Sequence, residues 1–418
     1  MQLPGPEDRV ALLLPGSHRY VDAVIRLLTA GAFPIPLDPK LTATERARIL
    51  GGLAPHRVIT SESELDELLA VLPPAGLPRG RPMHCTSGTT GTPKGVYSGL
   101  LDDDSARALL EEERDLWDFR ADDVHLVLSP LHHSAPLRFA MGTALAGGRV
   151  LLPGPFDPAT VTEAILADRP TSMFCVPAHL QRLFAHWDVV GVPDLSSFRL
   201  LAHAGAPCPP EVKRRLLELF PPGSTWEFYG STEGQFTACR SEEQLERPGT
   251  VGRARPGRTL SVDPDHTLWC VVPEHARFRY FGAPEKTAAA WRETDAGPAF
   301  TVGDHGRIDE DGYVHLEGRR EDLIITGGVN VYPAEVEAVL SEHPDVADVA
   351  VYGVPDPEWG HRVCAAVVGG ADEEALRDFA RERLVPAKRP KDYRTLTSLP
   401  RTSTGKVQRF GLADDHAG

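Results

Sequence analysis

The chain has 418 residues, of which 41% are hydrophobic and 25% charged, and its formal net charge at pH 7 is −15. This length predicts two or three domains, and the composition is that of a globular protein with a full hydrophobic core. The acidic balance argues against nucleic acid as a partner, and no stretch approaches the roughly 20 apolar residues of a membrane span.

The first 60 residues alternate between short apolar runs and helical patterns. We expect strands at 10–14, 33–37 and 57–60, and helices at 18–31 and 42–53 with Thr42 as N-cap. Strand–helix alternation of this kind predicts an α/β fold with a parallel, doubly wound sheet.

The same alternation resumes at residue 122. Strands are expected at 122–130, 149–152 and 172–176, and 200–207 and 226–234 each predict a strand that ends in a glycine turn. The expected helices are one that ends near 145, 157–167, one that begins at Pro177, and 210–220. Several strand–helix turns carry glycine and hydroxyl residues, so we expect the chemistry at the carboxyl ends of the strands.

The last third of the chain changes character twice. Short strands between 249 and 280 predict a small β subdomain, and 299–314 predicts a hairpin that turns at Glu310–Gly312. The charged stretch 319–322 then precedes a helix (333–343), two strands (347–353 and 362–368) and a helix (372–384). We therefore predict a large domain over 1–318, a hinge at 319–322 and a small α/β domain over 323–418.

A loop rich in glycine and hydroxyl groups covers 86–96, with the sequence Thr-Ser-Gly-Thr-Thr-Gly-Thr-Pro-Lys-Gly-Val. Glycines and backbone N–H groups in such a loop can surround a polyphosphate, with Lys94 as the cation. The segment does not fit the Walker pattern. A flexible linker is the alternative interpretation.

Three further stretches suit a nucleotide but are weak alone. Tyr229–Glu233 could stack a base, contact a phosphate and hold Mg²⁺, or it could be a polar surface turn. Asp304 after Gly303 could accept the hydroxyls of a ribose, although such an aspartate is more often a turn residue. Lys406 lies on a glycine turn of what is otherwise a basic tail.

Other site types find less support. His132 and His133 could bind a metal, but a place in a pocket wall is the stronger interpretation because no further ligand falls at a useful spacing. There is no Gly-x-Ser-x-Gly elbow. The six cysteines lack Cys-x-x-Cys spacing and Met1–Asp8 does not resemble a signal peptide, so we expect reduced thiols and a cytoplasmic protein.

Taken together, these stretches resemble the adenylate-forming superfamily, which includes acyl-CoA synthetases, peptide-synthetase adenylation domains and firefly-type luciferases. The resemblance extends from Val10 to Arg409, and its most specific signals are 86–95, 229–233, 303–304, 318–328 and 400–409, in the order of the family. It implies a large N-terminal AMP-binding domain and a small mobile C-terminal domain.

The resemblance also implies roles for individual residues. The β- and γ-phosphates of ATP would be held by Thr86, Ser87, Gly88, Thr89, Thr90, Gly91 and Lys94. Adenine would lie at Tyr229, with Gly230 and Ser231, and against Gly205, Ala206 and Pro207.

The reaction centre would combine residues from both domains. Thr232 would contact the α-phosphate, Glu233 would hold Mg²⁺, and Lys406 would reach the acid and the α-phosphate. Asp304 would bind the ribose with help from Arg319, and Glu321 would be the hinge residue, where the family usually has Asp or Lys. The candidate catalytic residues are thus Lys406, Glu233, Thr232, Thr86 and His133.

The resemblance also shows departures. The chain starts at what resembles the second strand–helix unit of the family, so we expect a short form that lacks part of the N-terminal region. The β subdomain is also abbreviated, which leaves the substrate pocket and any homodimer open. The substrate pocket is expected to be lined by His133, Phe174, Ala204, Phe228, Gly230 and Phe236.

The favoured function is ATP-dependent activation of an aliphatic or aromatic carboxylic acid, followed by transfer to CoA. Residues 131–135 carry no carboxylate for the amine of an amino acid, which disfavours amino-acid substrates. Transfer of the acyl group to a carrier protein, an amine or another nucleophile is the alternative. A nucleotide-binding scaffold without catalysis is a third interpretation.

Overall fold

The computed structural model describes residues 2–87, 93–205, 208–264, 266–318, 323–331, 333–400, 407, 409 and 412–413. The chain divides into two compact units. The first contains Met1–Pro39, Ala54–Cys85 and Gly95–Gly318, and the second contains Lys40–Leu53, Thr86–Lys94 and Arg319–Gly418. The sequence interpretation also ends its large domain at 318, but it assigns 40–53 and 86–94 to that domain.

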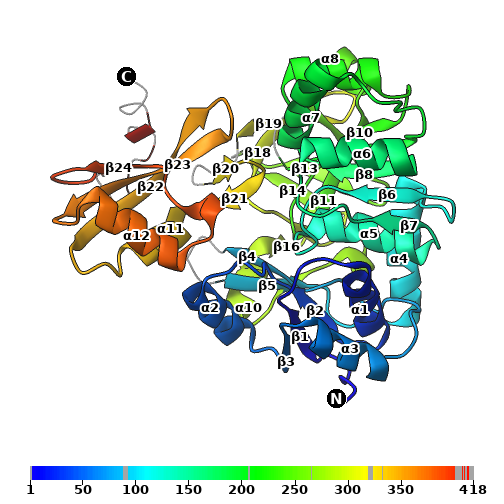
Figure 1. Cartoon of the computed structure of the whole chain (residues 1–418), viewed down its shortest axis with the longest axis horizontal. Helices are drawn as coiled ribbons and strands as arrows, with labels where there is room; N and C mark the ends of the chain where they lie inside the picture. Colours follow the sequence, from blue (N-terminus) through cyan, green and yellow to red (C-terminus); the bar gives the residue numbers. More distant parts are fainter. Residues whose placement is uncertain are drawn as a thin grey trace. The chain divides into compact units, whose positions relative to one another are not determined.

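A small parallel sheet opens the first unit (Figure 1). Its strand order is β2-β1-β3, with β1 at Arg9–Leu12, β2 at Phe33–Pro36 and β3 at Arg57–Ile59. Helix α1 (His18–Thr29) begins at the N-cap Ser17 and packs against β2 and α3 (Glu62–Val71). The alternating pattern predicts this sheet correctly, whereas α3, which starts with a capping box at Ser61, was not predicted from the sequence.

The largest sheet has the strand order β18-β19-β12-β11-β10-β9-β8-β6-β7. Strands β7, β6, β8, β9 and β10 are parallel, and the sheet turns antiparallel from β11 onward. Its strands are β6 Val124–Val127, β7 Arg149–Leu151, β8 Ser172–Cys175, β9 Leu200–His203, β10 Thr225–Gly230, β11 Gln235–Arg240, β12 Thr250–Ala254, β18 His305–Ile308 and β19 Tyr313–Gly318.

Helices cover this sheet and bury its apolar side chains. They are α4 Asp103–Trp117, α5 Ser134–Leu145, α6 Pro158–Asp168, α7 Pro177–Val190 and α8 Pro210–Leu219. Leu126, Met173 and Leu201 of the parallel strands pack in one core with α6, α7 and α8. Most of these elements match the expected strand–helix units, but α4 was not predicted.

Short strands form the β subdomain that the sequence predicts. One sheet has the order β13-β14-β17-β16 and another β15-β5-β4. The strands are β4 His84–Ser87, β5 Pro93–Tyr97, β13 Thr259–Val262, β14 Leu268–Val271, β15 Arg279–Tyr280, β16 Trp291–Arg292 and β17 Ala299–Phe300, and the short helices are α9 Glu243–Glu246, η1 Glu274–Ala276 and α10 Pro284–Ala290.

The predicted hairpin at 299–314 is partly correct. Strands β18 and β19 pair antiparallel, and the turn between them is closed by a hydrogen bond from the Gly312 amide to the Asp309 carbonyl at 3.0 Å. Strand β17 instead pairs with β14 and β16, because Phe300 packs into an aromatic core with Phe236 and Phe278. Tertiary packing thus separates β17 from the hairpin.

The second unit contains a sheet with the order β21-β20-β23-β22, and β24 pairs with β23. Its strands are β20 Ile324–Thr326, β21 Val329–Val331, β22 Val346–Asp356, β23 Gly360–Gly369 and β24 Asp392–Thr395, and its helices are α2 Ala43–Leu53, α11 Pro333–Leu340, α12 Glu373–Arg383 and η2 Pro386–Lys388. The predicted N-cap Thr42 accepts from the Glu45 amide at 3.2 Å, and Glu45 also accepts from the Val385 amide.

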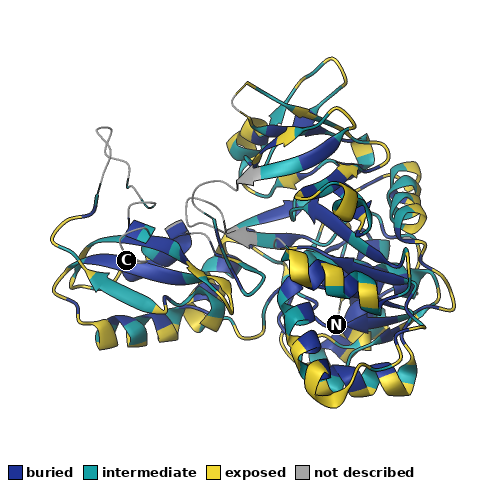
Figure 2. Cartoon of the chain, turned by 90° about the horizontal axis from the view of Figure 1, so that it is seen from above, coloured by how far each residue is buried: buried dark blue, intermediate teal, exposed yellow. Residues whose placement is uncertain are grey.

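Burial follows the layers of each unit. Figure 2 shows helices that carry exposed residues along one side and buried residues along the other, with buried strands beneath them. Such amphipathic faces are what a helix needs to cover a sheet. Within the described residues, no helix combines the length and the apolar composition required to cross a membrane.

A glycine in α5 provides a test of this packing. A Cβ at Gly142 would lie 2.3 Å from the ring of the buried Phe119, so Gly142→Ala should destabilise the protein by about 1–3 kcal/mol through overpacking. Gly51→Ala is the matched control, since a Cβ there meets nothing within 4 Å and alanine favours the helix. Thermal unfolding by calorimetry measures both; a Gly142→Ala protein as stable as wild type would contradict the packing.

Candidate functional site

The polar turn predicted at the end of β10 is a tight chain reversal. The Ser231 amide donates to the Gly234 carbonyl at 2.8 Å, and the Glu233 amide donates to the Ser231 hydroxyl at 3.2 Å. A Cβ at Gly230 would lie 2.9 Å from both the Gly234 oxygen and the Gln235 Cα. Because only glycine permits this approach, the turn presents Ser231, Thr232 and Glu233 at the edge of the sheet.

Two predicted nucleotide-binding residues, 75 positions apart, are in direct contact. The Tyr229 hydroxyl donates a hydrogen bond to a carboxylate oxygen of the buried Asp304. One face of the Tyr229 ring stacks on Phe236, with centroids 4.8 Å apart and planes at 16°. Asp304 follows Gly303, whose φ of +78° favours glycine. The fold therefore fixes an aromatic ring and a carboxylate beside the turn.

Glu233, the expected magnesium ligand, is half-buried and faces Tyr280. The Tyr280 hydroxyl donates to its Oε1 at 2.9 Å, and Arg81 donates to its main-chain oxygen at 3.3 Å. A single carboxylate, held in this way, fits Mg²⁺, which takes one or two protein carboxylates and fills its other positions with phosphate and water.

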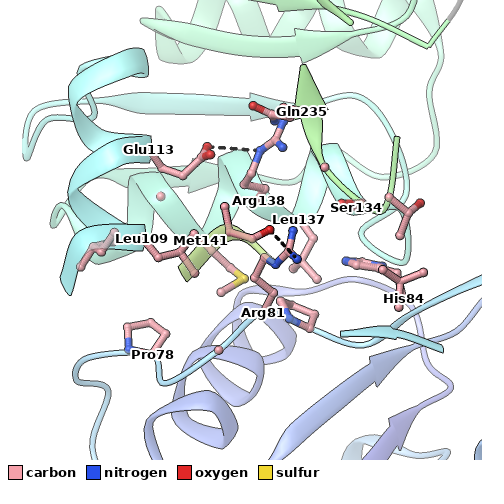
Figure 3. A pocket seen from close by; sticks show the side chains of 18 of the residues that line it. Pro78, Arg81, His84, Leu109, Glu113, Ser134, Leu137, Arg138, Met141 and Gln235 are labelled. Atoms are coloured by element: carbon pink, nitrogen blue, oxygen red, sulfur yellow. Dashed lines mark hydrogen bonds and ion pairs between the residues drawn. The ribbon is translucent and has the colours of Figure 1, made fainter. Parts of the chain in front are cut away.

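A cavity of about 130 Å³ begins at this turn (Figure 3). It lies between α4, α5, the segment before β4 and the residues after β12. Its lining is Pro78, Gly80, Arg81, Pro82, His84, Val96, Ala106, Leu109, Leu110, Glu113, Ser134, Leu137, Arg138, Met141, Gly142, Leu145, Ser231, Thr232, Gly234, Gln235, Arg255, Arg258, Val272 and Ala276. Both predicted site residues Ser231 and Thr232 therefore face a cavity within the first unit.

An ion-pair network of the buried Arg255 and four half-buried side chains forms one wall of this cavity. Glu113 lies 2.9 Å from Arg255 and 3.4 Å from Arg138, while Glu112 lies 2.6 Å from Arg258. Burial opposes the charged form of Glu113, but Arg255 and Arg138 outweigh it and lower its pKa to about 2. Burial lowers the pKa of Arg138 to about 10, which leaves its guanidinium charged at neutral pH.

Of the three histidines in this region, His84 lines the cavity. Burial lowers the pKa of His84 to about 3, and its ring is hydrogen-bonded to the backbone of His132. The rings of His132 and His133 are 4.3 Å apart, and His133 is the N-cap of α5 without a side-chain cap hydrogen bond. Within the described residues, no group of three or more metal-binding side chains occurs.

The remaining predicted residues fall into two groups. Gly205 is described, with φ of +92°, and Lys94 is half-buried in β5, whereas Thr86 and Ser87 are described by the backbone of β4 only. Outside the described residues lie Gly88, Thr89, Thr90, Gly91, Ala206, Pro207, Arg319, Glu321 and Lys406.

The expected pocket lining differs from the lining of this cavity. None of His133, Phe174, Ala204, Phe228, Gly230 and Phe236 lines it, and Phe174 and Phe228 pack with Trp117 and Phe139 in an aromatic core. Sequence reasoning missed Arg81, Glu113, Arg138 and Gln235. A signal was present for Arg138, which interrupts the apolar stretch from Pro136 to Gly142 of α5.

Two family models match this chain. The AMP-binding enzyme model matches residues 83–274, and the model of the AMP-binding enzyme C-terminal domain matches 335–406. A feruloyl-CoA synthase of Amycolatopsis is 34% identical, with 97% of this chain and 89% of the relative covered. A 2-succinylbenzoate–CoA ligase of Geobacillus kaustophilus is 36% identical, with 97% and 87% covered.

A solved o-succinylbenzoate CoA synthetase from Bacillus subtilis has the same architecture, with a TM-score of 0.85 and 26% identity over 98% of this chain and 89% of that chain. The chain therefore belongs to the adenylate-forming superfamily of AMP-binding enzymes, among its acyl-CoA synthetases. This confirms the resemblance inferred from the sequence, and with it the class of acid–thiol ligase.

The buried neutral His84 makes stability depend on acidity. Between pH 6.5 and 3 the unfolded chain binds a proton at this position that the folded chain does not bind, so the free energy of unfolding falls as the pH falls. At pH 5.5 the loss for one such group is about 1 kcal/mol. His84→Gln should lose less stability than wild type between pH 7 and 5.5 in urea unfolding.

The control for this experiment is His305→Gln, at an exposed position. It should keep the acid sensitivity of wild type. An equal loss of stability in wild type and His84→Gln would show that His84 titrates normally in the folded protein.

Proposed function

We propose that this protein uses ATP to convert a carboxylic acid to an acyl-adenylate, with release of pyrophosphate, and then transfers the acyl group to CoA. The hydrogen bond between Tyr229 and Asp304, beside the turn that carries Thr232 and Glu233, is the observation that carries this proposal. It joins a ring that suits a base and a carboxylate that suits a ribose, beside the turn whose Thr232 lines the cavity. Membership of the family supports the same reaction.

The nucleotide would bind along the end of the largest sheet. Tyr229 and Gly205 are proposed for adenine, together with Gly230, Ser231, Ala206 and Pro207. Asp304 would accept the ribose hydroxyls, with Arg319 assisting. Phosphate binding is assigned to the loop from Thr86 to Lys94, where backbone N–H groups and a lysine suit a triphosphate.

The metal proposal rests on the fit of Glu233. Its carboxylate would hold Mg²⁺, which, when bound, offsets the negative charge of the triphosphate. Tyr280, by donating to Oε1, restrains the orientation of this carboxylate. Arg81 binds the main chain of the same residue and so fixes the backbone from which the carboxylate extends.

In the adenylation step, the negative carboxylate of the acid must approach the negative triphosphate of ATP, so the repulsion between them has to be offset. An oxygen of the acid bonds to the α-phosphorus while the bond from that phosphorus to the pyrophosphate oxygen breaks. Thr232 lines the cavity and would position the α-phosphate, and Lys406 would stabilise the charge that builds up there. The CoA sulfur then attacks the acyl carbon and AMP leaves; Glu321 is proposed as the hinge between the two half-reactions.

The cysteines support a reducing compartment. All six are free thiols, and Cys175, Cys239, Cys270 and Cys364 are buried, where burial raises the pKa of each thiol and leaves it unreactive. Free cysteines in these numbers are typical of cytoplasmic enzymes, which is the location we propose.

The reaction is tested by pyrophosphate release over a panel of aliphatic and aromatic acids, with and without CoA. Lys406→Ala should lower the adenylation rate by about 10²–10³, since it removes an aimed cation. Lys40→Ala, at an exposed lysine, should leave the rate unchanged. A Lys406→Ala protein that adenylates at the wild-type rate would overturn the mechanism. Release of pyrophosphate without a CoA product would indicate another acceptor.

The nucleotide site is tested by Tyr229→Phe. Loss of the hydroxyl frees the Asp304 carboxylate to reorient, so the KM for ATP should rise by roughly 10-fold. Tyr313→Phe is a matched control in the same unit, because the Tyr313 hydroxyl donates to Glu243 at 2.9 Å away from the cavity. An equal KM for ATP in both variants would exclude a direct role for the Tyr229–Asp304 pair.

A further inference from the structure

The cavity combines an apolar floor with an excess of positive charge. Leu109 and Leu110 of α4 and Leu137, Met141 and Leu145 of α5 supply the apolar part. Within the described residues, the charged groups that line it are four arginines and one glutamate, namely Arg81, Arg138, Arg255, Arg258 and Glu113. An unsubstituted apolar acid would be bound by the leucines and the methionine, and it would leave the arginines without a role in binding.

The carboxylates near the cavity do not balance these arginines. Glu113 is shared by Arg138 and Arg255, and Glu112, behind the wall, is shared by Arg255, Arg258 and His275. Four arginines therefore face two glutamates. The next carboxylate, Glu233, is assigned to Mg²⁺ by the proposed function. Since a buried charge without a counter-charge is costly, the site favours an anionic guest.

Arg81 belongs to this excess through its hydrogen bonds. Its guanidinium donates to the carbonyl oxygens of Glu233, Ala276 and Arg277, at 3.3, 3.5 and 3.2 Å, which are neutral acceptors. These bonds orient the group without neutralising it. Burial lowers the pKa of Arg81 to about 10, which still leaves it charged at neutral pH.

Five side chains that line the cavity carry buried polar atoms without a hydrogen-bond partner among the described residues. In four of them, Arg81, Arg138, Arg255 and Arg258, Nε is such an atom; Arg138 adds Nη2, and Gln235 contributes both amide atoms. Gln235 is only 5% exposed, so bulk water has little access to its amide. Figure 3 shows the Arg138 guanidinium between the carboxylate of Glu113 and the amide of Gln235. Buried polar groups are nearly always paired, and an unpaired one costs about 1–3 kcal/mol.

We propose that the acid activated by this protein carries a second carboxylate, which binds Nη2 of Arg138 and the amide NH₂ of Gln235 inside the cavity. This inference rests on the proposed function, because the first carboxylate must lie at the Thr232 end of the same cavity. A guanidinium and a neighbouring amide offer donors to both oxygens of one carboxylate. The leucines and Met141 line the same cavity and suit an apolar body, so the substrate class is a dicarboxylic acid with an apolar linker.

The decisive measurement is pyrophosphate release with matched acid pairs. Each aliphatic or aromatic dicarboxylic acid is compared with its monomethyl ester, which has nearly the same shape but a neutral distal end. The wild-type kcat/KM should favour the diacid by about 10²-fold or more, because a site built for a charged acceptor rejects the analogue that lacks it. Equal or better use of the monoesters would overturn the inference.

The variants separate recognition from folding. Gln235→Leu removes two unpaired buried atoms and so should fold, yet the diacid preference should fall by roughly 10-fold. Arg138→Met should lower that preference by about 10²-fold, while Arg138→Lys, which keeps the charge, should retain part of it. Arg107→Met, at an exposed position on α4, is the control and should keep the wild-type preference.

The failures of the two proposals are distinguishable. If monoacids release pyrophosphate and the diacid preference is absent, or if Gln235→Leu and Arg138→Met leave the preference intact, the inference is wrong and the proposed function stands. If no acid of either series releases pyrophosphate, both are wrong. A preference that falls in both variants but not in Arg107→Met supports the inference.

Discussion

The close approach of the chain to itself at Gly230 is the constraint on which the site depends. Strand β10 pairs parallel with β9 on one side and antiparallel with β11 on the other, so the sheet changes direction at this strand. The reversal is possible because no side chain separates Gly230 from Gln235. It places Tyr229 on the buried side, next to Asp304, and Thr232 at the cavity. A looser turn would lose both contacts together.

Local sequence patterns predict where the helices and strands of this fold lie better than they predict which elements pack against one another. Alternating strands and helices predict the parallel part of the sheet, since each unit carries its own apolar run and cap. Helix α4 was not predicted because it is strongly charged and buries little besides Ala106 and Trp117, although Asp102 caps it through the Ser105 amide. The assignment of β17 to another sheet depends on Phe300, whose ring finds its partners only in the folded protein.

In the site, too, some residues can be predicted from local sequence and others cannot. Glycines, hydroxyls, Tyr229 and Asp304 lie in compact motifs, so their chemistry can be inferred from residue type and spacing. The arginine wall has no such motif, because Arg81, Glu113, Arg138 and Arg255 come from four separate segments. An arginine in an otherwise apolar helical stretch was the available signal at Arg138. The sequence does not show which acceptors surround Arg138 in the folded protein, so the role of this arginine could not be inferred from it.

The arrangement of α5 suggests where substrate choice resides. On one side of this helix the rings of Phe139, Phe174 and Phe228 pack with centroids 5.5–6.3 Å apart. Arg138 lies over Phe139 and Phe228, at 5.6 and 5.3 Å from the ring centroids. Cation–π contacts of this kind hold the guanidinium in place without supplying a hydrogen-bond acceptor. The aromatic core therefore acts as a support for Arg138, beside the cavity between α4 and α5 that we propose for the acid.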